Sequence, residues 1–181
     1  MHIWKHFLTI THHKFVVMQG CFKMGLYRQG LMHDMSKYSP TEFFVGAKYF
    51  QGDRSPNNAE REDKGYSEAW LHHKGRNKHH FEYWIDYSFK AQNSMGLLPA
   101  PMPDRYIAEM FADRVAACKI YNKQYYTQRD ALIYYKRGVG KMQHFLHPYT
   151  KEKLELFLNM LAEKGEEETF RYIKNEFLRR K

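Results

Sequence analysis

The sequence contains little cysteine and no long apolar run. Only Cys21 and Cys118 are present among 181 residues, which excludes a disulfide framework and a cysteine-rich metal site. No apolar stretch approaches the roughly 18–20 residues of a membrane span. Histidines and charged residues interrupt the N-terminal segment, unlike the unbroken apolar core of a signal peptide. We therefore expect a cytoplasmic protein without a membrane segment.

The sequence also lacks repeats, low-complexity tracts and strand-like alternation of convincing length. Its hydrophobic content of 43% is too high for a disordered chain, and its length suits one domain with a substantial core. Apolar residues mostly recur at steps of three and four, which is typical of helices. We therefore predict a single all-α domain, a helical bundle, over residues 1–181.

Acidic residues are fewer than basic ones, and the formal net charge of +9 favours an anionic partner. Apart from a cluster at 179–181, the basic residues are scattered. Both nucleic acid and a small phosphorylated substrate are possible partners. The scattered basic residues favour the small substrate. An amphipathic stretch at 154–161 fits packing within the domain or against a second copy of the chain, as in a homo-oligomer.

Helix signals divide the first half of the chain. Apolar spacing predicts a helix over 3–25 and a short helix over 31–37. The motif SPTE at 39–42 combines an N-cap serine, a first-turn proline and a capping-box glutamate, and it predicts a helix that ends near residue 50. The polar segment 51–65 is expected to be an exposed loop.

The second half is also predicted to be helical, with a turn at KGRN (74–77) and a proline-rich connector at 95–103. Asp104 is expected to cap the helix that follows it, and Gly165 to end one helix before the last. The predicted helices cover 66–73, 78–94, 105–123, 127–137, 150–164 and 166–179.

Several histidines and acids stand where a metal site needs them. His13 and Asp113 each lie within the apolar stripe of a predicted helix, and GLMHDMSKYSP places His33 and Asp34 side by side in an apolar run. Burying such groups is costly without a hydrogen bond, an ion partner or a metal. Each of these residues alone is also compatible with an ordinary buried hydrogen bond or ion pair.

Two His-His pairs flank the turn in LHHKGRNKHHFEYW. They are His72–His73 and His79–His80, and a turn between helices can bring one histidine of each pair to a common point. Which member of each pair is used stays open, and a basic surface loop is the alternative. Imidazole and carboxylate ligands together suit one or two ions of Fe, Mn, Zn, Co or Ni, whereas calcium prefers an all-oxygen site.

The order of these residues resembles that of the HD-domain superfamily of metal-dependent phosphohydrolases, over about residues 10–120. That superfamily carries a histidine, an adjacent His-Asp pair, further histidines and a late aspartate. The resemblance implies that His13, His33, Asp34 and Asp113 bind one ion, and that the group at 72–80 binds a second. The helices over about 127–181 would then pack on this metal-binding core.

The segment HDMSK is similar to the HD-x-x-K form of HD-GYP phosphodiesterases and of the di-iron inositol oxygenase. This similarity implies that Lys37 lies near substrate phosphate or hydroxyl groups. The GYP residues themselves are absent, and Lys74 stands where those proteins carry a glutamate. Arg76 is a second candidate for holding phosphate oxygens, because arginine suits two-point contacts.

The chain also resembles, over nearly its full length, an uncharacterised bacterial family that carries close versions of HDxSKYSPTEF and HHKGRNKHHFEYW. We expect a metal-dependent phosphohydrolase that acts on a nucleotide or another phosphate ester through a metal-activated water. Two alternatives stay open. One is a di-iron oxygenase on the same scaffold, and the other is a non-catalytic module that binds a nucleotide or nucleic acid.

Overall fold

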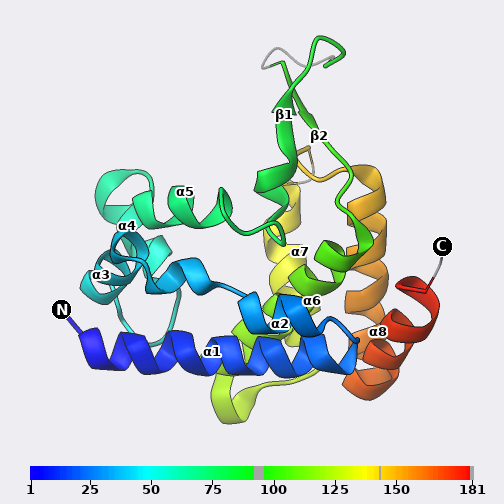
Figure 1. Cartoon of the computed structure of the whole chain (residues 1–181), viewed down its shortest axis with the longest axis horizontal. Helices are drawn as coiled ribbons and strands as arrows, with labels where there is room; N and C mark the ends of the chain where they lie inside the picture. Colours follow the sequence, from blue (N-terminus) through cyan, green and yellow to red (C-terminus); the bar gives the residue numbers. More distant parts are fainter. Residues whose placement is uncertain (92–95, 143, 180–181) are drawn as a thin grey trace.

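The computed structural model describes residues 1–91, 96–142 and 144–179, and its fold is all-α, as the sequence predicts. Figure 1 shows α1 lying along one edge, with the other helices stacked above it and a thin hairpin projecting from the opposite edge. The α-helices are α1 (Ile3–Lys23), α2 (Tyr27–Met32), α3 (Pro40–Lys48), α4 (Pro56–Lys64), α5 (Glu68–Lys74), α6 (Asp104–Asn122), α7 (Asp130–Met142) and α8 (Pro148–Tyr172). Short 3-10 helices cover Met35–Tyr38, Phe81–Trp84 and Lys123–Tyr125, and a π-helix covers Ile173–Phe177.

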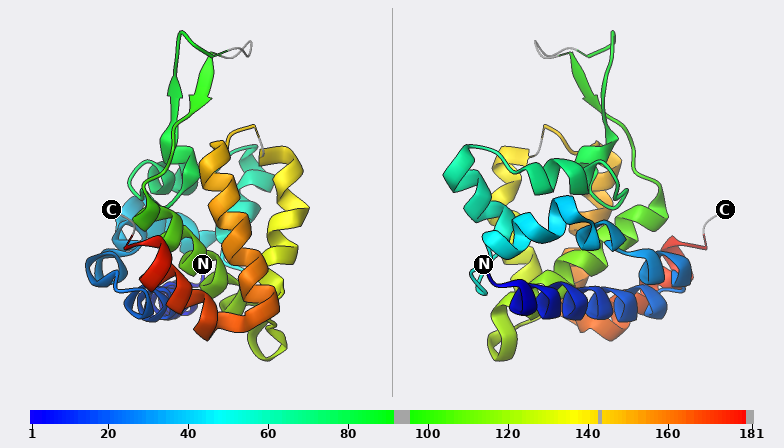
Figure 2. Two further views of the ribbon diagram at one scale, coloured as in Figure 1. Left: turned by 90° about the vertical axis from the view of Figure 1, so that its right-hand side faces the viewer. Right: turned by 60° about the vertical axis from the view of Figure 1, so that its left-hand side comes forward.

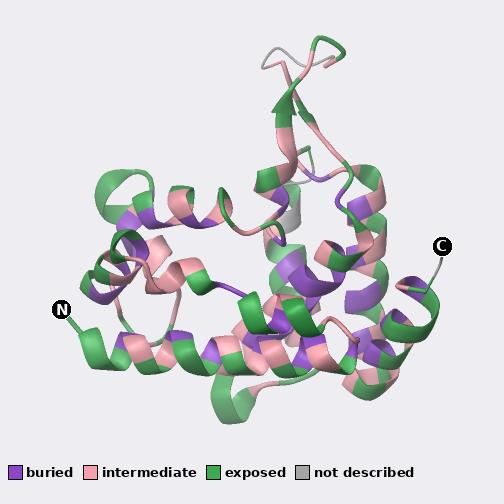
Figure 3. Cartoon of the chain, in the orientation of Figure 1, coloured by how far each residue is buried: buried purple, intermediate pink, exposed green. Residues whose placement is uncertain are grey.

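Helix α6 is the central element of the fold. It packs against α1, α7 and α8, and Figure 2 shows it enclosed between α1 and α8. Every residue from Ile107 to Ala112 is buried, so this part of the helix is covered on all sides. The core beside it includes Phe111 and Phe157, whose rings meet edge to face with centroids 5.7 Å apart. Glu109, which lies in this stretch, is therefore buried, and Figure 3 colours much of α6 as buried.

The helices of the first 40 residues follow the prediction only in part. Helix α1 ends at Lys23, and Gly25 has φ of +81°, so the predicted stop near residue 25 is confirmed. The predicted helix over 31–37 is wrong, because α2 ends at Met32 and Asp34 adopts the left-handed region with φ of 55°. Aspartate tolerates this conformation better than most residues do. The chain then continues as the 3-10 helix Met35–Tyr38.

The N-cap at Ser39 is confirmed: its Oγ accepts a hydrogen bond from Glu42 N–H at 3.4 Å, and α3 begins at Pro40. The predicted loop over 51–65 is wrong, because it contains α4 between Pro56 and Gly65. This helix begins with a proline in its first turn and ends at a glycine with φ of +81°, and both residues are typical of helix boundaries.

The predicted helix over 78–94 is also wrong. Residues 81–84 form a 3-10 turn, and Ile85–Tyr87 (β1) pairs antiparallel with Leu97–Pro99 (β2), with Asp86 opposite Leu98. The Trp84 indole N–H donates to the Lys78 carbonyl at 2.8 Å, which closes the chain on itself before β1. Residues 92–94 of that predicted helix lie outside the described residues.

The remaining helices follow the sequence more closely. Asp104 is the first residue of α6 and not its N-cap, and it accepts a hydrogen bond from the Tyr149 hydroxyl at 2.6 Å. Gly165 has φ of +82° and divides α8, where the sequence predicts a boundary between two helices. Helix α7 runs to Met142, beyond the predicted end at 137. Within the described part of the chain, no helix combines the length and apolar character that crossing a membrane requires.

Candidate metal centre

Asp34 lies where four separate parts of the chain meet. Its side chain is buried, and it follows α2 at the left-handed turn that separates α2 from the 3-10 helix Met35–Tyr38. His13 comes from α1 and Asp113 from α6, while His73, His79 and His80 come from the end of α5 and the turn after it. Residues more than 70 positions apart thus converge on one carboxylate.

The first cluster consists of His13, His33, Asp34 and Asp113, whose ligand atoms all lie within 4.8 Å of one another. His13 Nε2 is 2.9 Å from Asp113 Oδ1 and 3.8 Å from Asp34 Oδ2, and His33 Nε2 is 3.3 Å from Asp34 Oδ2. Ligands that each lie about 2.1 Å from one ion are separated by roughly 3.0–3.4 Å in octahedral or tetrahedral arrangements. These spacings therefore fit a cation site.

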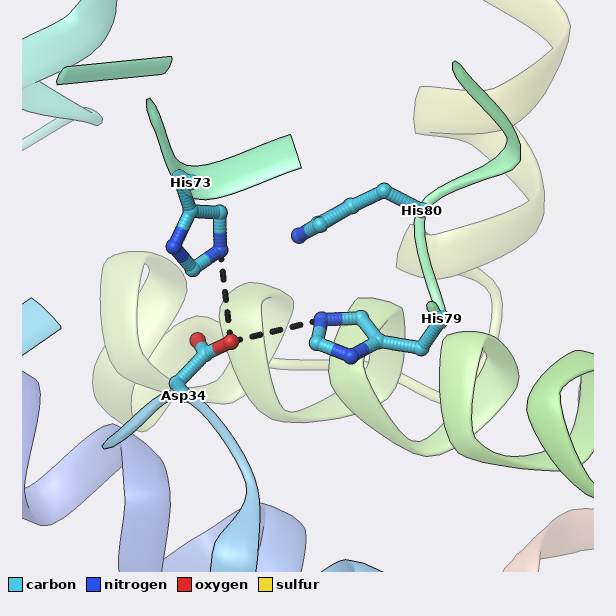
Figure 4. Close-up of side chains that lie close together, drawn as sticks. All are labelled: Asp34, His73, His79 and His80. Atoms are coloured by element: carbon cyan, nitrogen blue, oxygen red, sulfur yellow. Dashed lines mark ion pairs between the residues drawn. The ribbon is translucent and has the colours of Figure 1, made fainter. Parts of the chain in front are cut away.

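A second cluster shares Asp34 with the first. It contains Asp34, His73, His79 and His80, whose ligand atoms also lie within 4.8 Å of one another. Figure 4 shows Asp34 Oδ1 facing His73 Nε2 at 3.2 Å and His79 Nε2 at 3.3 Å, with His80 on the same side. Because Oδ2 faces the first cluster and Oδ1 the second, one carboxylate can bridge two ions.

Several ligand atoms in these clusters lack hydrogen bonds. Among the described residues, His33, His79 and His80 each bury an Nε2 atom that has no hydrogen-bond partner, and Asp34 Oδ1 has none either, whereas Asp34 Oδ2 pairs with the Lys37 ammonium group at 2.6 Å. An unpaired buried polar atom costs about 1–3 kcal/mol. A cation bound among these four atoms would offset that cost. The residues present therefore fit a metal ion.

In three of the cluster histidines, the second ring nitrogen, Nδ1, contacts a buried glutamate. Glu109 Oε1 lies 3.0 Å from His33 Nδ1 and 3.2 Å from His79 Nδ1. Its second oxygen accepts a hydrogen bond from the Gln29 side-chain amide at 2.9 Å. Glu109 thus fixes one histidine of each cluster with Nε2 directed to Asp34, which is the usual role of a carboxylate behind a metal-binding histidine.

Glu42 makes the corresponding contact to the third histidine. Its Oε2 lies 2.7 Å from His73 Nδ1, and its Oε1 lies 2.6 Å from His72 Nδ1. His72 is therefore bonded to Glu42 and is not a member of either cluster, unlike His73. Sequence reasoning missed Glu42 as a site residue, because it interpreted this glutamate only as part of a capping box.

Helix α5, which carries His73, is itself anchored by a buried acid. Glu60 on α4 accepts hydrogen bonds from the Ser67 hydroxyl at 2.6 Å and from Glu68 N–H at 3.2 Å. Ser67 in turn caps α5 by accepting from Trp70 N–H at 3.0 Å. These bonds satisfy the free amides of the first turn and fix the direction in which α5 delivers His73.

Of the two residues predicted to bind phosphate, one lies at the centre and the other does not. Lys37 Nζ lies 2.6 Å from Asp34 Oδ2, so the structure places Lys37 at the centre. Arg76 is exposed, and its guanidinium donates only to the His72 carbonyl at 3.4 Å. The structure therefore does not bring Arg76 together with the other candidate residues.

Charged groups of both signs surround the centre. The carboxylates of Glu42, Glu109, Asp34 and Asp113 lie beside the ammonium group of Lys37 and the cluster histidines. Burial lowers the pKa of His33, but the charge of Asp34 outweighs burial and holds this pKa well above its usual range. Burial alone raises the pKa of Asp34, but the charges of His33 and Lys37 outweigh burial and hold this pKa well below its usual range. Burial and the charge of His79 hold the pKa of His80 well below its usual range. Ionised carboxylates and a neutral imidazole are the forms that bind cations.

A cavity of about 770 Å³ adjoins the two clusters. His13, Lys37, His73, His80 and Asp113 contribute to its wall, so part of each cluster faces open space. This volume lies within the range of about 300–1,000 Å³ that is typical of small-molecule sites. The centre is therefore both buried among its ligands and accessible from one side.

Comparison with known proteins identifies a family. Its profile, described as "Family of unknown function (DUF5662)", matches residues 2–160. The chain belongs to this family. The match to DUF5662 includes every residue of both clusters, and also Glu42 and Glu109. Neither the curated proteins nor the solved structures contain a significant match to the chain.

Proposed function

We propose that this protein is a metal-dependent phosphohydrolase of the HD-domain type, which hydrolyses a nucleotide or another small phosphate ester. The observation that carries the proposal is the position of Asp34. Its two oxygens face two sets of histidine Nε2 atoms, and Oδ2 also pairs with the Lys37 ammonium group. The order of these residues along the chain is also the order by which the sequence resembles the HD-domain superfamily.

The ligand set suggests one or two divalent transition-metal ions. His13, His33 and Asp113 would hold one ion, and His73, His79 and His80 a second, with Asp34 shared. Nitrogen and carboxylate donors without cysteine favour Fe, Mn, Zn, Co or Ni. When bound, such ions supply Lewis acidity and activate water near neutral pH.

The chain's own residues would perform the remaining tasks. Lys37 has an exposed fraction of 27% and lines the cavity, so its ammonium group can donate to a phosphoryl oxygen while its charge remains balanced by Asp34. Glu109 and Glu42 keep the Nδ1 protons of the histidines in place, and thereby keep each Nε2 directed at the centre. The buried setting of His33, Asp34 and His79 excludes bulk water behind the reacting group.

Elemental analysis of the untagged protein tests this proposal. We expect transition metal in the wild type, and a loss of it in the His13→Ala and Asp113→Ala variants. His12→Ala is the matched control, because His12 is the exposed neighbour of His13 on α1 and should leave the metal content unchanged. A wild-type protein that carries no more than trace metal after growth in metal-replete medium refutes the proposal. A screen of phosphate esters with Mn, Fe, Co and Ni added then identifies the activity.

A di-iron oxygenase is the second candidate, because sharing Asp34 between two histidine-rich clusters also suits a pair of irons. Purified protein with a visible absorption band and with oxygen consumption in place of phosphate release would favour it. A non-catalytic nucleotide- or nucleic-acid-binding module predicts no retained metal, so the same elemental analysis separates it from both enzymes.

A further inference from the structure

The cavity beside the metal centre extends well beyond the metal ligands. Its far wall is formed by the start of α4, one side of α6 and the exposed face of α7. Three arginines stand on this wall, one from each helix: Arg61, Arg114 and Arg137. Because the cavity is continuous, a molecule that reaches the ions at one end can contact these arginines at the other.

None of the three arginines is neutralised by an ion pair within the described residues. Arg61 donates to the Asn58 side-chain oxygen at 3.0 Å and lies over the Trp70 ring, 5.4 Å from its centroid. Arg114 lies over Tyr135, at 5.8 Å, and its buried Nε has no hydrogen-bond partner. Arg54 differs from these three, because both of its terminal nitrogens bind Glu62 at 2.7 Å.

Arg114 is the most informative of the three. It directly follows Asp113 on α6, so the same helix presents to one cavity a carboxylate of the first cluster and a guanidinium that forms no ion pair within the described residues. A buried N–H without an acceptor is costly in a protein interior. The Arg114 guanidinium lies over the face of the Tyr135 ring. This contact does not supply the oxygen acceptors that the five N–H donors of an arginine can bind.

Carboxylates on the same wall form no direct ion pair with these arginines within the described residues. Asp130 stays charged and accepts hydrogen bonds from Thr127 and Asn122. Burial raises the pKa of Glu82, and the charges of Arg114 and Arg61 act against burial, so this carboxyl group lies near two of the three arginines without pairing with either in the described part of the chain. Asp53 is exposed at the edge of the cavity.

We propose that Arg61, Arg114 and Arg137 form an anion-binding subsite for a second oxyanion group of the substrate, remote from the phosphoryl group at the metal centre. The inference rests on the proposed function. It narrows the substrate to a phosphate ester that also carries a further phosphate or carboxylate group. The cavity of about 770 Å³ has room for a molecule of that size.

The test is made on full-length protein from which metal has been removed with a chelator, followed by dialysis. Inorganic phosphate is the probe, titrated by calorimetry at low ionic strength. We expect wild-type protein to bind phosphate, and Arg114→Met to bind it about 10- to 100-fold more weakly, the range for losing hydrogen bonds to a charged group. Arg28→Met is the matched control, because Arg28 is exposed on α2 and does not line the cavity.

Two further variants protect the test against misfolding. Arg137 is exposed, so Arg137→Met should fold normally and still weaken phosphate binding. Arg114→Lys keeps the charge but loses the two-point geometry, and should bind phosphate with an affinity between those of wild type and Arg114→Met. Metal-free wild type that does not bind phosphate overturns the subsite, as does equal affinity in wild type, Arg114→Met and Arg137→Met.

Failure of the subsite can be distinguished from failure of the proposed function. Elemental analysis of untreated Arg114→Met should give the same metal content as wild type, because Arg114 belongs to neither cluster. Metal bound as expected with phosphate affinity unaltered by the variants removes only the subsite. Absence of metal from the wild type would instead refute the proposed phosphohydrolase, and the phosphate titration would still test whether the arginines bind an anion.

Discussion

If both clusters bind metal as proposed, replacing Glu109 with glutamine should weaken metal binding at both at once. Glu109 Oε1 contacts His33 in one cluster and His79 in the other, so a single carboxylate supports both sites. The Glu109→Gln variant keeps the shape of the side chain but removes its charge. It also places an amide NH₂ opposite the Gln29 amide, which already donates to Glu109 Oε2 and to the Arg105 carbonyl.

The size of the effect follows from this geometry. Changing a carboxylate behind a metal-binding histidine typically lowers metal affinity 10- to 100-fold, or about 1.4–2.7 kcal/mol for each ion. Gln29 cannot rotate its amide to remove the mismatch without losing its bond to Arg105, so we expect the upper part of this range. Glu42→Gln makes a contrast, because His73 is the one cluster histidine that Glu42 contacts within the described residues, so this variant should weaken binding only at the second cluster.

Competition with a chromogenic chelator measures both affinities. Glu152→Gln, on the exposed surface of α8, is the control for the same chemical change away from the centre. Circular dichroism of the metal-free variants confirms folding, and Glu109→Asp supplies a second variant if glutamine is not tolerated. Two unchanged affinities in folded Glu109→Gln protein would refute the role of this carboxylate.

Three further predictions concern single residues. Lys37→Met should retain its metal but lose turnover of a phosphate ester, because the ammonium group is the cation nearest the centre; unchanged turnover removes Lys37 from the mechanism. Gly46→Ala should lower the free energy of unfolding by about 1–3 kcal/mol in chemical denaturation, because a Cβ there would overlap the His6 imidazole; an equally stable variant contradicts this contact. Burial and the charge of Lys37 lower the pKa of His6 to about 4. Below pH 6.5 the unfolded state therefore binds a proton that the folded state refuses until about pH 4, and stability should fall by up to about 3 kcal/mol as the pH drops across this window. A His6→Gln variant whose stability depends on pH as steeply as that of the wild type would show that His6 does not contribute.

The sequence predicted the members of the first cluster because each stands out within its own segment. His13 and Asp113 interrupt apolar helical stripes, and His33–Asp34 interrupts an apolar run, so polarity in the wrong place is a local signal. Glu42 and Glu109 give no such signal. Glu42 also fits a cap, and Glu109 stands among ordinary surface-like charges until the fold buries α6 on every side. The spacing of four residues between Glu109 and Asp113, which share a helical face, is the one clue that was available.

The errors in secondary structure have a related cause. Phe81, Trp84 and Ile85 follow helical spacing, yet the Trp84 indole bonds to the Lys78 carbonyl and the chain turns into a hairpin. That contact depends on tertiary packing, which periodicity does not record. In 51–65 the polarity suggested a loop, although Glu60 is fully buried and caps the neighbouring helix. The buried face of α4 is polar because it hydrogen-bonds to the neighbouring helix. Such a helix has no apolar stripe by which the sequence could predict it.

The conformation of Asp34 connects these observations. A non-glycine residue at φ of 55° costs about 1 kcal/mol or more, and the same residue buries a carboxylate whose Oδ1 accepts no hydrogen bond. A continuous helix over 31–37 would avoid the backbone cost. It would also turn Asp34 along a helical surface, and one carboxylate could not then face His33 with one oxygen and His73 and His79 with the other. The break after Met32 is therefore the feature of the fold that creates the centre, and the cost of that turn is one that binding of cations would offset.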